Sequence, residues 1–428
     1  MPERVAIVGL GYGLPGLWNG AAWASLARGE SHVRPLPDDL AATWRLDRWP
    51  GISPADWRIA APGKTASQRR LTASHLVGLA TGAAVREAGL SGSDSTVRTD
   101  STVRSGSTSR SASSSQSHAA SSHDPARTGL VIGGSKGRLG PPLGALAQQS
   151  FPGLLAPDAA LAAAAVHVAA EYATCPVAAC ATGLVSLVQA ARWIRWGHCD
   201  RVVAGSGDAG LCGPVLASYR RLGVLSGSPQ PFAADRDGFV IGEGAAVLVL
   251  EREAVARGRG VAPLAYWSGE DLRADAAGLV AASPDGEAVA VTIEGALKSA
   301  DLSPSAIDAI SLHGTGTRQN DASEAAGLAA VFGSRLRAIP AFSVKGGWGH
   351  TLGAAGALEA AVCVQMLRTQ TVPPHLSAAS PVGDRFACDP DCGDLLLPSR
   401  ATSSPLRHVL TLSLGFGGHI AAGVLSRA

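Results

Sequence analysis

The stretch Val177–Ile194 reads VAACATGLVSLVQAARWI, in which a cysteine stands among small residues and a helical pattern follows. The residues up to Cys180 are small and compatible with a strand, and Thr182 and Gly183 are expected to turn the chain. Apolar residues then recur at helical spacing as far as the end of the stretch. A thiol at such a strand-to-helix corner lies near the positive end of the helix dipole, which favours the thiolate. Cys180 is therefore a candidate nucleophile, although an isolated cysteine is more often a packed core thiol.

Around this corner, short apolar runs that end in glycine-rich turns alternate with helical patterns. The expected strands are Arg4–Gly11, Gly129–Ser135, Arg201–Asp208, Ala245–Glu251, Ala309–Gly316 and Val409–Gly418. Helices are expected over Ala73–Leu90 and Gly356–Gln370, and two prolines stop the second. Strand–helix alternation indicates an α/β fold, in which catalytic groups are expected in the turns that follow strands.

The composition of the 428 residues, with 46% hydrophobic and 16% charged residues, is typical of a protein with a sizeable buried core. A net charge of +2 gives no reason to expect nucleic acid or an anionic membrane as the main partner. No second cysteine or histidine pair accompanies Cys388 and Cys392 at zinc-like spacing, so no metal site is expected. No apolar run reaches the roughly 18 residues of a membrane span, and the N-terminus begins with a strand pattern rather than a leader. We therefore expect a cytoplasmic protein.

Two segments are expected to carry no chemistry. Residues 91–126 are serine-rich, repeat DSTVR and have almost nothing to bury, so they are predicted to be a disordered surface insertion. The glycines of Val8–Gly16, VGLGYGLPG, superficially resemble a dinucleotide-binding turn. Leu14 stands where the third glycine is required, and Pro15 falls where the phosphate-binding helix should start. A structural turn is the favoured interpretation there.

A polar run follows one of the predicted strands. SLHGTGTRQNDASE (Ser311–Glu324) places His313 directly after an apolar strand and Asp321 and Glu324 a few residues later. A histidine at a strand end is more often structural than catalytic. The density of polar residues after it nevertheless predicts an organised network rather than a solvated loop.

Two further stretches combine glycine with residues of chemical interest. FSVKGGWGHTLGAAGALEAA (Phe342–Ala361) supplies Lys345 and His350, and Lys345 is one of only four lysines in the chain. LGFGGHIAAG (Leu414–Gly423) is expected to be a flexible glycine loop around Phe416 and Gly417, able to present backbone N–H groups or to move as a gate.

Taken together, five motifs in this order resemble the β-ketoacyl-acyl carrier protein synthase family, specifically its elongating Cys-His-His type. They are ACATG, PFAADRDGFVIGEGAAVLVLE (Pro231–Glu251), HGTGTRQNDASE, KGGWGHTLGAAG and GFGG. The resemblance covers nearly the whole chain except the serine-rich segment. It implies a thiolase-like fold of five layers, αβαβα, made of two similar halves. Residues 1–250 would carry the nucleophile, and residues 251–428 would carry both histidines.

The resemblance also implies a decarboxylative Claisen condensation. Cys180 would hold an acyl group, and His313 and His350 would stabilise the enolate formed from malonyl-acyl carrier protein. Lys345 would set the electrostatics, with Glu324 as its expected partner and Asp321 in support. The backbone at Phe416 and Gly417 would complete an oxyanion hole and gate the site. No metal and no redox cofactor is expected, because the substrates arrive on the phosphopantetheine of the carrier.

The expected partner is acyl carrier protein, and the expected assembly is a homodimer or a heterodimer with a ketosynthase-like subunit. Because carrier proteins are acidic, four arginines are candidates for docking: Arg69, Arg70, Arg220 and Arg221. Ordinary solvated arginines are about as probable. Alternatives to the condensing enzyme are a non-condensing partner subunit (a decarboxylase or chain-length factor) and a non-enzymatic carrier-binding protein. A nicotinamide oxidoreductase built on the first glycine turn is less favoured.

Some positions depart from the family pattern. His419 and Ile420 stand where threonine or serine and asparagine are usual, and Ala233 replaces a common aspartate. Lys136 and Arg138 place charge in a stretch that shapes the acyl pocket in relatives. These departures suggest a specialised synthase of polyketide or other secondary lipid synthesis.

Overall fold

The computed structural model describes residues 3–15, 17–35, 58–60, 72–90, 126–135, 158–211, 213–278, 283–393 and 395–428. Apart from its last residue, the predicted serine-rich insertion lies outside these ranges. Within them, no helix has the length and apolar character that crossing a membrane demands.

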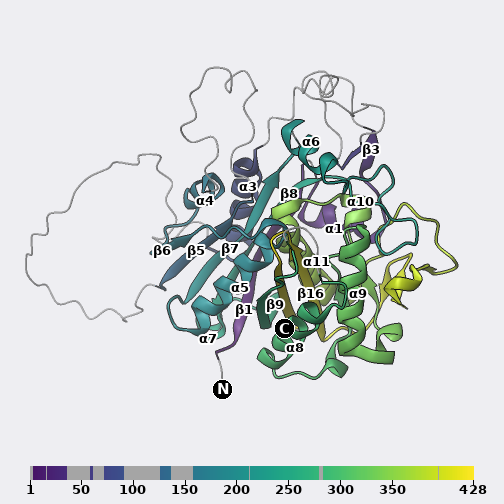
Figure 1. Cartoon of the computed structure of the whole chain (residues 1–428). Helices are drawn as coiled ribbons and strands as arrows, with labels where there is room; N and C mark the ends of the chain where they lie inside the picture. The colour runs from purple at the N-terminus through teal and green to yellow at the C-terminus, as the bar shows by residue number, and fades with distance from the viewer. Residues whose placement is uncertain are drawn as a thin grey trace, which may run out of the picture.

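A large mixed sheet organises the described part of the chain, and it consists of two half-sheets joined at their inner strands (Figure 1). The first half-sheet, from the centre outward, is β1 (Val5–Leu14), β8 (Glu243–Arg252), β7 (Arg201–Ala209), β5 (Thr128–Gly133) and β6 (Tyr172–Thr174). The second, from the centre outward, is β9 (Ala265–Ala274), β17 (His419–Ser426), β16 (His408–Gly415), β10 (Ala309–Ser311) and β11 (Ala341–Phe342). The junction is the antiparallel pairing of β1 with β9.

The two half-sheets repeat one topology. In each, the first strand in the chain lies innermost, followed outward by the fifth, fourth, second and third. The inner two pairings are antiparallel and the outer two are parallel in both halves. Two similar halves, expected from the resemblance, are therefore present. The expected boundary between residues 250 and 251 falls inside β8.

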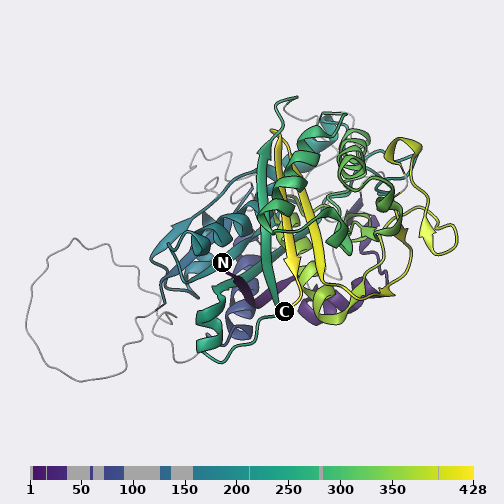
Figure 2. The same ribbon diagram turned by 90° about the horizontal axis from the view of Figure 1, so that it is seen from below.

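Helices form three layers around these half-sheets. Two helices, α5 (Thr182–Arg195) and α11 (Ala355–Thr369), pack against each other and against strands of both half-sheets. The outer face of the first half-sheet is covered by α3 (Ala73–Glu87) and α4 (Ala159–Ala165). The second is covered by α8 (Glu287–Ser299), with α9 (Arg318–Phe332) beside it. This arrangement, visible in Figures 1 and 2, gives the five layers of the predicted thiolase-like fold.

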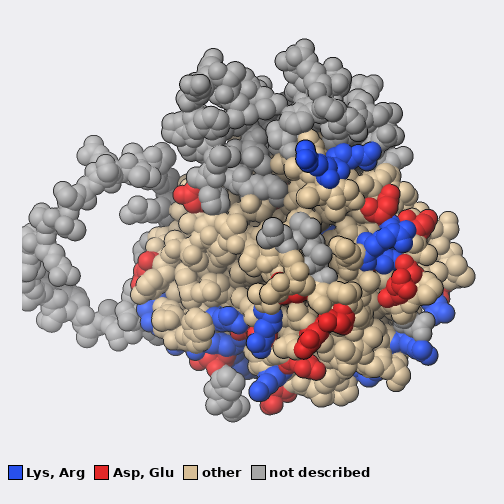
Figure 3. All heavy atoms as spheres, in the orientation of Figure 1, with Lys and Arg blue, Asp and Glu red and all other residues tan. Residues whose placement is uncertain are grey.

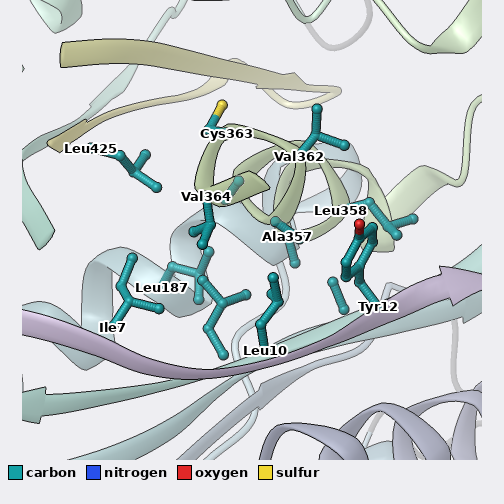
Figure 4. Close-up of a cluster of buried hydrophobic side chains, with 14 of the residues drawn as sticks. Ile7, Leu10, Tyr12, Leu187, Ala357, Leu358, Val362, Cys363, Val364 and Leu425 are labelled. Carbon is teal, nitrogen blue, oxygen red and sulfur yellow. The ribbon is translucent and has the colours of Figure 1, made fainter. Parts of the chain in front are cut away.

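Each helix layer has its own apolar core. The largest surrounds the central helices, and Figure 4 shows Leu187 of α5 near Ile7 of β1 and Leu358 of α11 near Tyr12 of the same strand. Separate clusters lie under α3 and under α8. Burial at about 25 cal/mol per Å² of apolar surface makes these contacts the main favourable contribution to folding. The central cluster holds the N-terminal ends of α5 and α11 in fixed positions.

The stretch Val8–Gly16 serves a structural purpose, but the expected turn lies only at its end. Gly9, Gly11 and Gly13 belong to strand β1, and the chain turns after Leu14 to pair with β2 (Leu17–Trp18). A Cβ atom on Gly9 would lie 2.2 Å from the Ala84 carbonyl oxygen, and one on Gly11 would lie 2.0 Å from that of Ala80. The glycines are therefore needed because α3 crosses β1 at backbone contact.

Candidate active site

Cys180 lies at the corner where the chain enters α5, in the short 3-10 turn η5 (Ala179–Ala181). The strand expected up to this residue is absent, because the nearest strand, β6, ends at Thr174. Thr182 and Gly183 are the first two residues of the helix rather than the turn. The helical pattern and the position of the thiol at the helix start agree with the expectation.

The backbone of this corner is held in an uncommon conformation. Ala179 has a φ of 47°, in the left-handed region that non-glycine residues rarely adopt. The Thr182 hydroxyl accepts a hydrogen bond from the Ala178 N–H (2.9 Å) and donates one to the Ala179 carbonyl (2.7 Å). One side chain thus ties both sides of the turn and fixes where the Cys180 side chain emerges.

The second half of the chain meets the Cys180 turn directly. η5 contacts η8 (Leu352–Ala354), which begins two residues after His350. It also contacts the end of β16, where a Cβ atom on Gly415 would lie 2.6 Å from the Ala178 carbonyl oxygen and 3.3 Å from the Cys180 nitrogen. The thiol-bearing turn is therefore packed between the segments that carry His350 and Phe416.

The two histidines lie together and are buried. The rings of His313 and His350 stand edge to face, with centroids 5.5 Å apart. Burial, the nearby Lys345 ammonium and His350 hold the pKa of His313 well below its usual value. At neutral pH the His313 ring is therefore neutral, with one N–H donor and one bare nitrogen.

Carboxylates from the start of α9 shape the loop that carries His313. Glu324 accepts hydrogen bonds from the backbone N–H groups of His313 (2.6 Å) and Gly314 (2.8 Å). Asp321 accepts from the N–H groups of Thr315 and Gly316. Burial raises the pKa of Glu324 to about 8, although the bonds from the two N–H groups oppose that shift. The polar run after His313 is thus an organised network, as predicted.

Lys345 has a different partner from the one expected. Its ammonium donates to the Glu359 carboxylate on α11 and to the backbone carbonyl of His313, rather than to Glu324. Both charged side chains are almost completely buried, and an unpaired charge at that depth is costly. Burial raises the pKa of Glu359 to about 7, against the lowering effect of Lys345. Sequence reasoning missed Glu359, although it is the only acidic residue of Gly356–Gln370.

Phe416 begins the short turn between β16 and β17, where Gly417 and Gly418 have φ values of 87° and 79°. The predicted loop Leu414–Gly423 is therefore too long, because Leu414–Gly415 and His419–Gly423 belong to strands. The Phe416 ring stacks on Tyr219, with centroids 6.2 Å apart.

A row of aromatic rings continues from Phe416 to the histidines. Tyr219 meets Phe239 edge to face at 5.7 Å, and Phe239 meets His350 at 4.8 Å between centroids. Sequence reasoning missed both Tyr219 and Phe239, because neither residue type in isolation indicates a site. The structure thus brings Cys180, His313, His350, Lys345 and Phe416 into one neighbourhood.

The docking candidates fall into two groups. Arg69 and Arg70, like Lys136 and Arg138, lie outside the described residues. Arg220 and Arg221 end α6 (Gly213–Arg221), and both are exposed. Figure 3 shows basic side chains gathered at the top of the molecule, in the region where Figure 1 labels α6.

Acidic, histidine and cysteine side chains in the described ranges do not gather into a set that could hold a metal ion. The Cys388 thiol lies 3.6 Å from the Leu395 carbonyl oxygen as a hydrogen-bond donor. Cys392 is buried, and burial raises its pKa to about 12. A thiol with so high a pKa is a poor metal ligand, since the thiolate is the ligand form.

The chain is similar in sequence and in fold to known proteins. The chain is 35% identical over 255 residues to the tetracenomycin polyketide synthase ketoacyl synthase alpha subunit of Streptomyces glaucescens, covering 58% of each chain. It is 31% identical over 281 residues to 3-oxoacyl-[acyl-carrier-protein] synthase 2 of Mycobacterium bovis, covering 63% of this chain and 65% of the relative. The matched regions thus span less than two thirds of these relatives. A solved complex of a type II polyketide synthase acyl-carrier protein with its ketosynthase bound to the hexaketide matches over the full length of both chains, with 26% identity and a TM-score of 0.80.

Two family models together match most of the sequence. The N-terminal domain of beta-ketoacyl synthase matches residues 2–256, and the C-terminal domain of beta-ketoacyl synthase matches residues 264–379. The first contains Cys180, and the second contains His313, Lys345, His350 and Glu359. With the repeated half-sheets and the shared site between them, these matches establish that the chain belongs to the β-ketoacyl synthase family.

Proposed function

We propose that this protein is an acyltransferase that joins an acyl group held on Cys180 to a malonyl unit held on acyl carrier protein, giving 3-ketoacyl-acyl carrier protein. The observation that carries the proposal is the convergence of a helix-start thiol with two buried imidazoles. The thiol comes from the first half of the chain and both imidazoles come from the second. Neither feature alone supports carbon–carbon bond formation.

The first step is transfer of the acyl group. The Cys180 sulfur attacks the acyl thioester carbonyl, a bond forms between sulfur and the acyl carbon, and the bond to the pantetheine sulfur breaks. The departing thiolate takes a proton. Backbone N–H groups of Cys180 and Phe416 are proposed to bind the tetrahedral oxyanion, and one such donor contributes about 2.7–4 kcal/mol to lowering the barrier.

The second step is decarboxylative condensation. The malonyl carbon–carboxylate bond breaks, carbon dioxide leaves, and the electron pair stays on the α-carbon as an enolate. N–H donors of His313 and His350 are proposed to bind the enolate oxygen. The α-carbon then attacks the acyl carbonyl and the sulfur of Cys180 leaves. The step balances without a redox cofactor or metal, and we propose that none is used.

Lys345 and Glu359 are proposed to hold the site without touching the substrate. The Lys345 ammonium donates to the His313 carbonyl, and Glu359 anchors that ammonium from α11. The positive charge also disfavours protonation of the His313 ring. A neutral His313 can donate a hydrogen bond to the enolate oxygen and leave the second nitrogen bare.

The proposed carrier partner and pathway are supported by the relatives. One relative is named as a polyketide ketoacyl synthase alpha subunit, another as a 3-oxoacyl-[acyl-carrier-protein] synthase, and a matching structure contains an acyl-carrier protein. We propose that this chain likewise receives its substrates from a carrier, in polyketide or fatty-acid synthesis. We also propose a cytoplasmic location, because Cys199, Cys363 and Cys392 are thiols outside any disulfide.

The proposed homodimer, or heterodimer with a ketosynthase-like subunit, has a suitable surface. The outermost strand of the first half-sheet, β6, is short and leaves one edge open among the described residues. Tyr172 on that strand is 50% exposed, and Val177 just beyond it is 53% exposed. An open strand edge flanked by apolar side chains is a site for pairing with another chain.

The test combines a panel of acyl-carriers with malonyl-carrier and intact-mass analysis of protein and products. Wild-type protein is expected to gain one acyl mass on Cys180 and to release 3-ketoacyl-carrier when malonyl-carrier is added. Cys180→Ala should lose both signals and keep its fold. Condensation by the Cys180→Ala variant would refute the nucleophile. Acylation and decarboxylation without a condensed product would identify a non-condensing partner subunit.

A further inference from the structure

The position of Phe416 depends on contacts made by its side chain. The residue stands between Gly415, which packs against the Cys180 turn, and two glycines in left-handed conformation. A turn with two such glycines has little backbone stiffness of its own. The Phe416 ring is half-buried. The contacts of this ring therefore act together with the backbone contacts of Gly415 in positioning the Phe416 N–H relative to Cys180.

Tyr219 supplies the ring contact that Phe416 makes. The two rings stack with an interplanar angle of 29° and a centroid separation of 6.2 Å. Tyr219 itself is only 7% exposed. Its ring packs edge to face against Phe239, and the Phe239 ring contacts His350. A single buried ring thus lies between Phe416 and the row that ends at the two imidazoles.

The other side of the same helical turn faces outward. Tyr219 is followed directly by Arg220 and Arg221, which are exposed, and by Leu222, which is 47% exposed. The final turn of α6 therefore carries a buried contact to Phe416 and an exposed basic and apolar surface. A partner that binds the exposed end of α6 would contact the helical turn that carries Tyr219, whose ring stacks on Phe416.

We propose that Tyr219 is a positioning residue that holds Phe416 beside Cys180 and couples the exposed end of α6 to the opening of that gate. The inference deepens the proposed function and rests on it. An aromatic pair stabilises its contact enough to shift an open–closed equilibrium by about two- to twelvefold. Loss of the Tyr219 ring should therefore open the gate and misplace the Phe416 N–H, without removing any reacting group.

The experiment compares Tyr219→Leu with Tyr219→Phe in the full-length protein. The first variant removes the aromatic stack and keeps an apolar side chain, and the second keeps the ring. Alkylation of Cys180 by iodoacetamide, followed at the peptide level, is expected to be about two- to twelvefold faster in Tyr219→Leu. The kcat for condensation is expected to fall by a similar factor, with the KM for acyl-carrier changed less than kcat. Tyr219→Phe, which keeps the ring, should lie closer to wild type than Tyr219→Leu does in both measurements.

A third variant separates positioning from general loosening of the fold. If Tyr219 acts through Phe416, adding Tyr219→Leu to Phe416→Leu should change the alkylation rate no further. Additive effects of the two substitutions would overturn the inference, as would wild-type alkylation and kcat in Tyr219→Leu. The failure of the proposed function looks different, because wild-type protein would then not be acylated on Cys180 at all. Far-UV circular dichroism confirms that each variant is folded before its rates are compared.

Discussion

The ammonium of Lys345 shows how one buried charge can stabilise the site and tune it. It holds the carbonyl of His313 in place and lowers the pKa of the His313 ring. It depends on Glu359 for its own neutralisation. A charge pair at this depth is weak evidence for added stability, but breaking it is expensive because one charge is left without a partner.

Lys345→Met should lower the free energy of unfolding by about 3–5 kcal/mol, because Glu359 loses its partner in the core. Urea unfolding measures the change. Arg28→Ala is the matched control: Arg28 pairs with Glu30 at 2.6 Å on the surface, where solvent screens the two charges and the pair contributes little to stability. The double variant Lys345→Met with Glu359→Gln should recover part of the loss. A Lys345→Met protein as stable as Arg28→Ala would contradict the argument.

Among single residues, the sequence indicated the candidate reacting groups more readily than the side chains that contact and position them. Cys180, His313, Lys345 and His350 stand in glycine-rich or polar surroundings that single them out. Glu359 and Tyr219 stand in helices, where their role depends on which element packs against them. Glu324 was expected to pair with Lys345, yet it caps two backbone N–H groups instead. The spacing along the chain does not reveal which acid an ammonium meets.

The elements that carry the site approach one another at backbone contact, and glycine makes this approach possible. Gly183 of α5 faces the nitrogen of Ala357, and Gly356 of α11 faces Leu184, each with no room for a Cβ atom. The Cys180 turn meets the end of β16 at Gly415 in the same manner. The distance between nucleophile and histidines is thus set by helices and strands in direct contact.

Gly415→Ala tests this close approach. Its Cβ atom would lie 2.6 Å from the Ala178 carbonyl oxygen, so the Cys180 turn must shift. We expect at least about tenfold slower acylation of Cys180 and a stability loss of about 1–3 kcal/mol. Intact mass over time and thermal unfolding give the two values.

The control for that substitution is Gly20→Ala in α1 (Asn19–Ala27), where no heavy atom lies within 4 Å of the new Cβ atom. Alanine should raise stability there by about 0.4–1 kcal/mol. Equal acylation rates in the two variants would show that the turn does not depend on close packing at Gly415.

The strands with continuous apolar runs were predicted correctly. Strands whose apolar residues are interrupted by polar ones were missed. β7 (RVVAGSGDA) and β8 (EGAAVLVLER) each contain a continuous run of small and branched apolar residues, and both were predicted. β9 reads AYWSGEDLRA and was missed, because its polar residues hide the strand period. β17 was taken as part of a loop, because its first residue follows two glycines. The order of strands in space comes from pairing between distant segments, and only the family resemblance indicated it.

At the scale of the whole molecule, histidines buried in their neutral form contribute a loss of stability in acid, whereas the raised pKa values of Glu324 and Glu359 contribute in the opposite direction. His375 accepts a hydrogen bond from the Ser343 N–H at Nδ1 (3.1 Å) and lies 3.2 Å from the Pro231 carbonyl oxygen at Nε2, which assigns the proton to Nε2. Burial lowers its pKa from 6.5 to about 4. Between these values the unfolded chain binds a proton that the folded chain does not, so stability rises with pH and is lost as pH falls.

The loss attributable to His375 between pH 6.5 and 4 is about 3 kcal/mol. The difference in unfolding free energy between wild type and His375→Gln should therefore fall by this amount as the pH is lowered through the window, measured by urea titration at several pH values. His313 has its pKa lowered too and keeps part of the slope in the variant. An unaltered slope in His375→Gln would show that this ring is protonated in the folded protein.

The repeated half-sheets have a consequence for how such a protein can change over generations. The Cys180 sulfur comes from one repeat, and both imidazoles come from the other. The packing of α5 against α11, between the two repeats, therefore also sets the distance between the sulfur and the imidazoles. A substitution where α5 meets α11 is therefore expected to displace the thiol relative to the imidazoles, whereas one on the outward face of α3 or α8 is not.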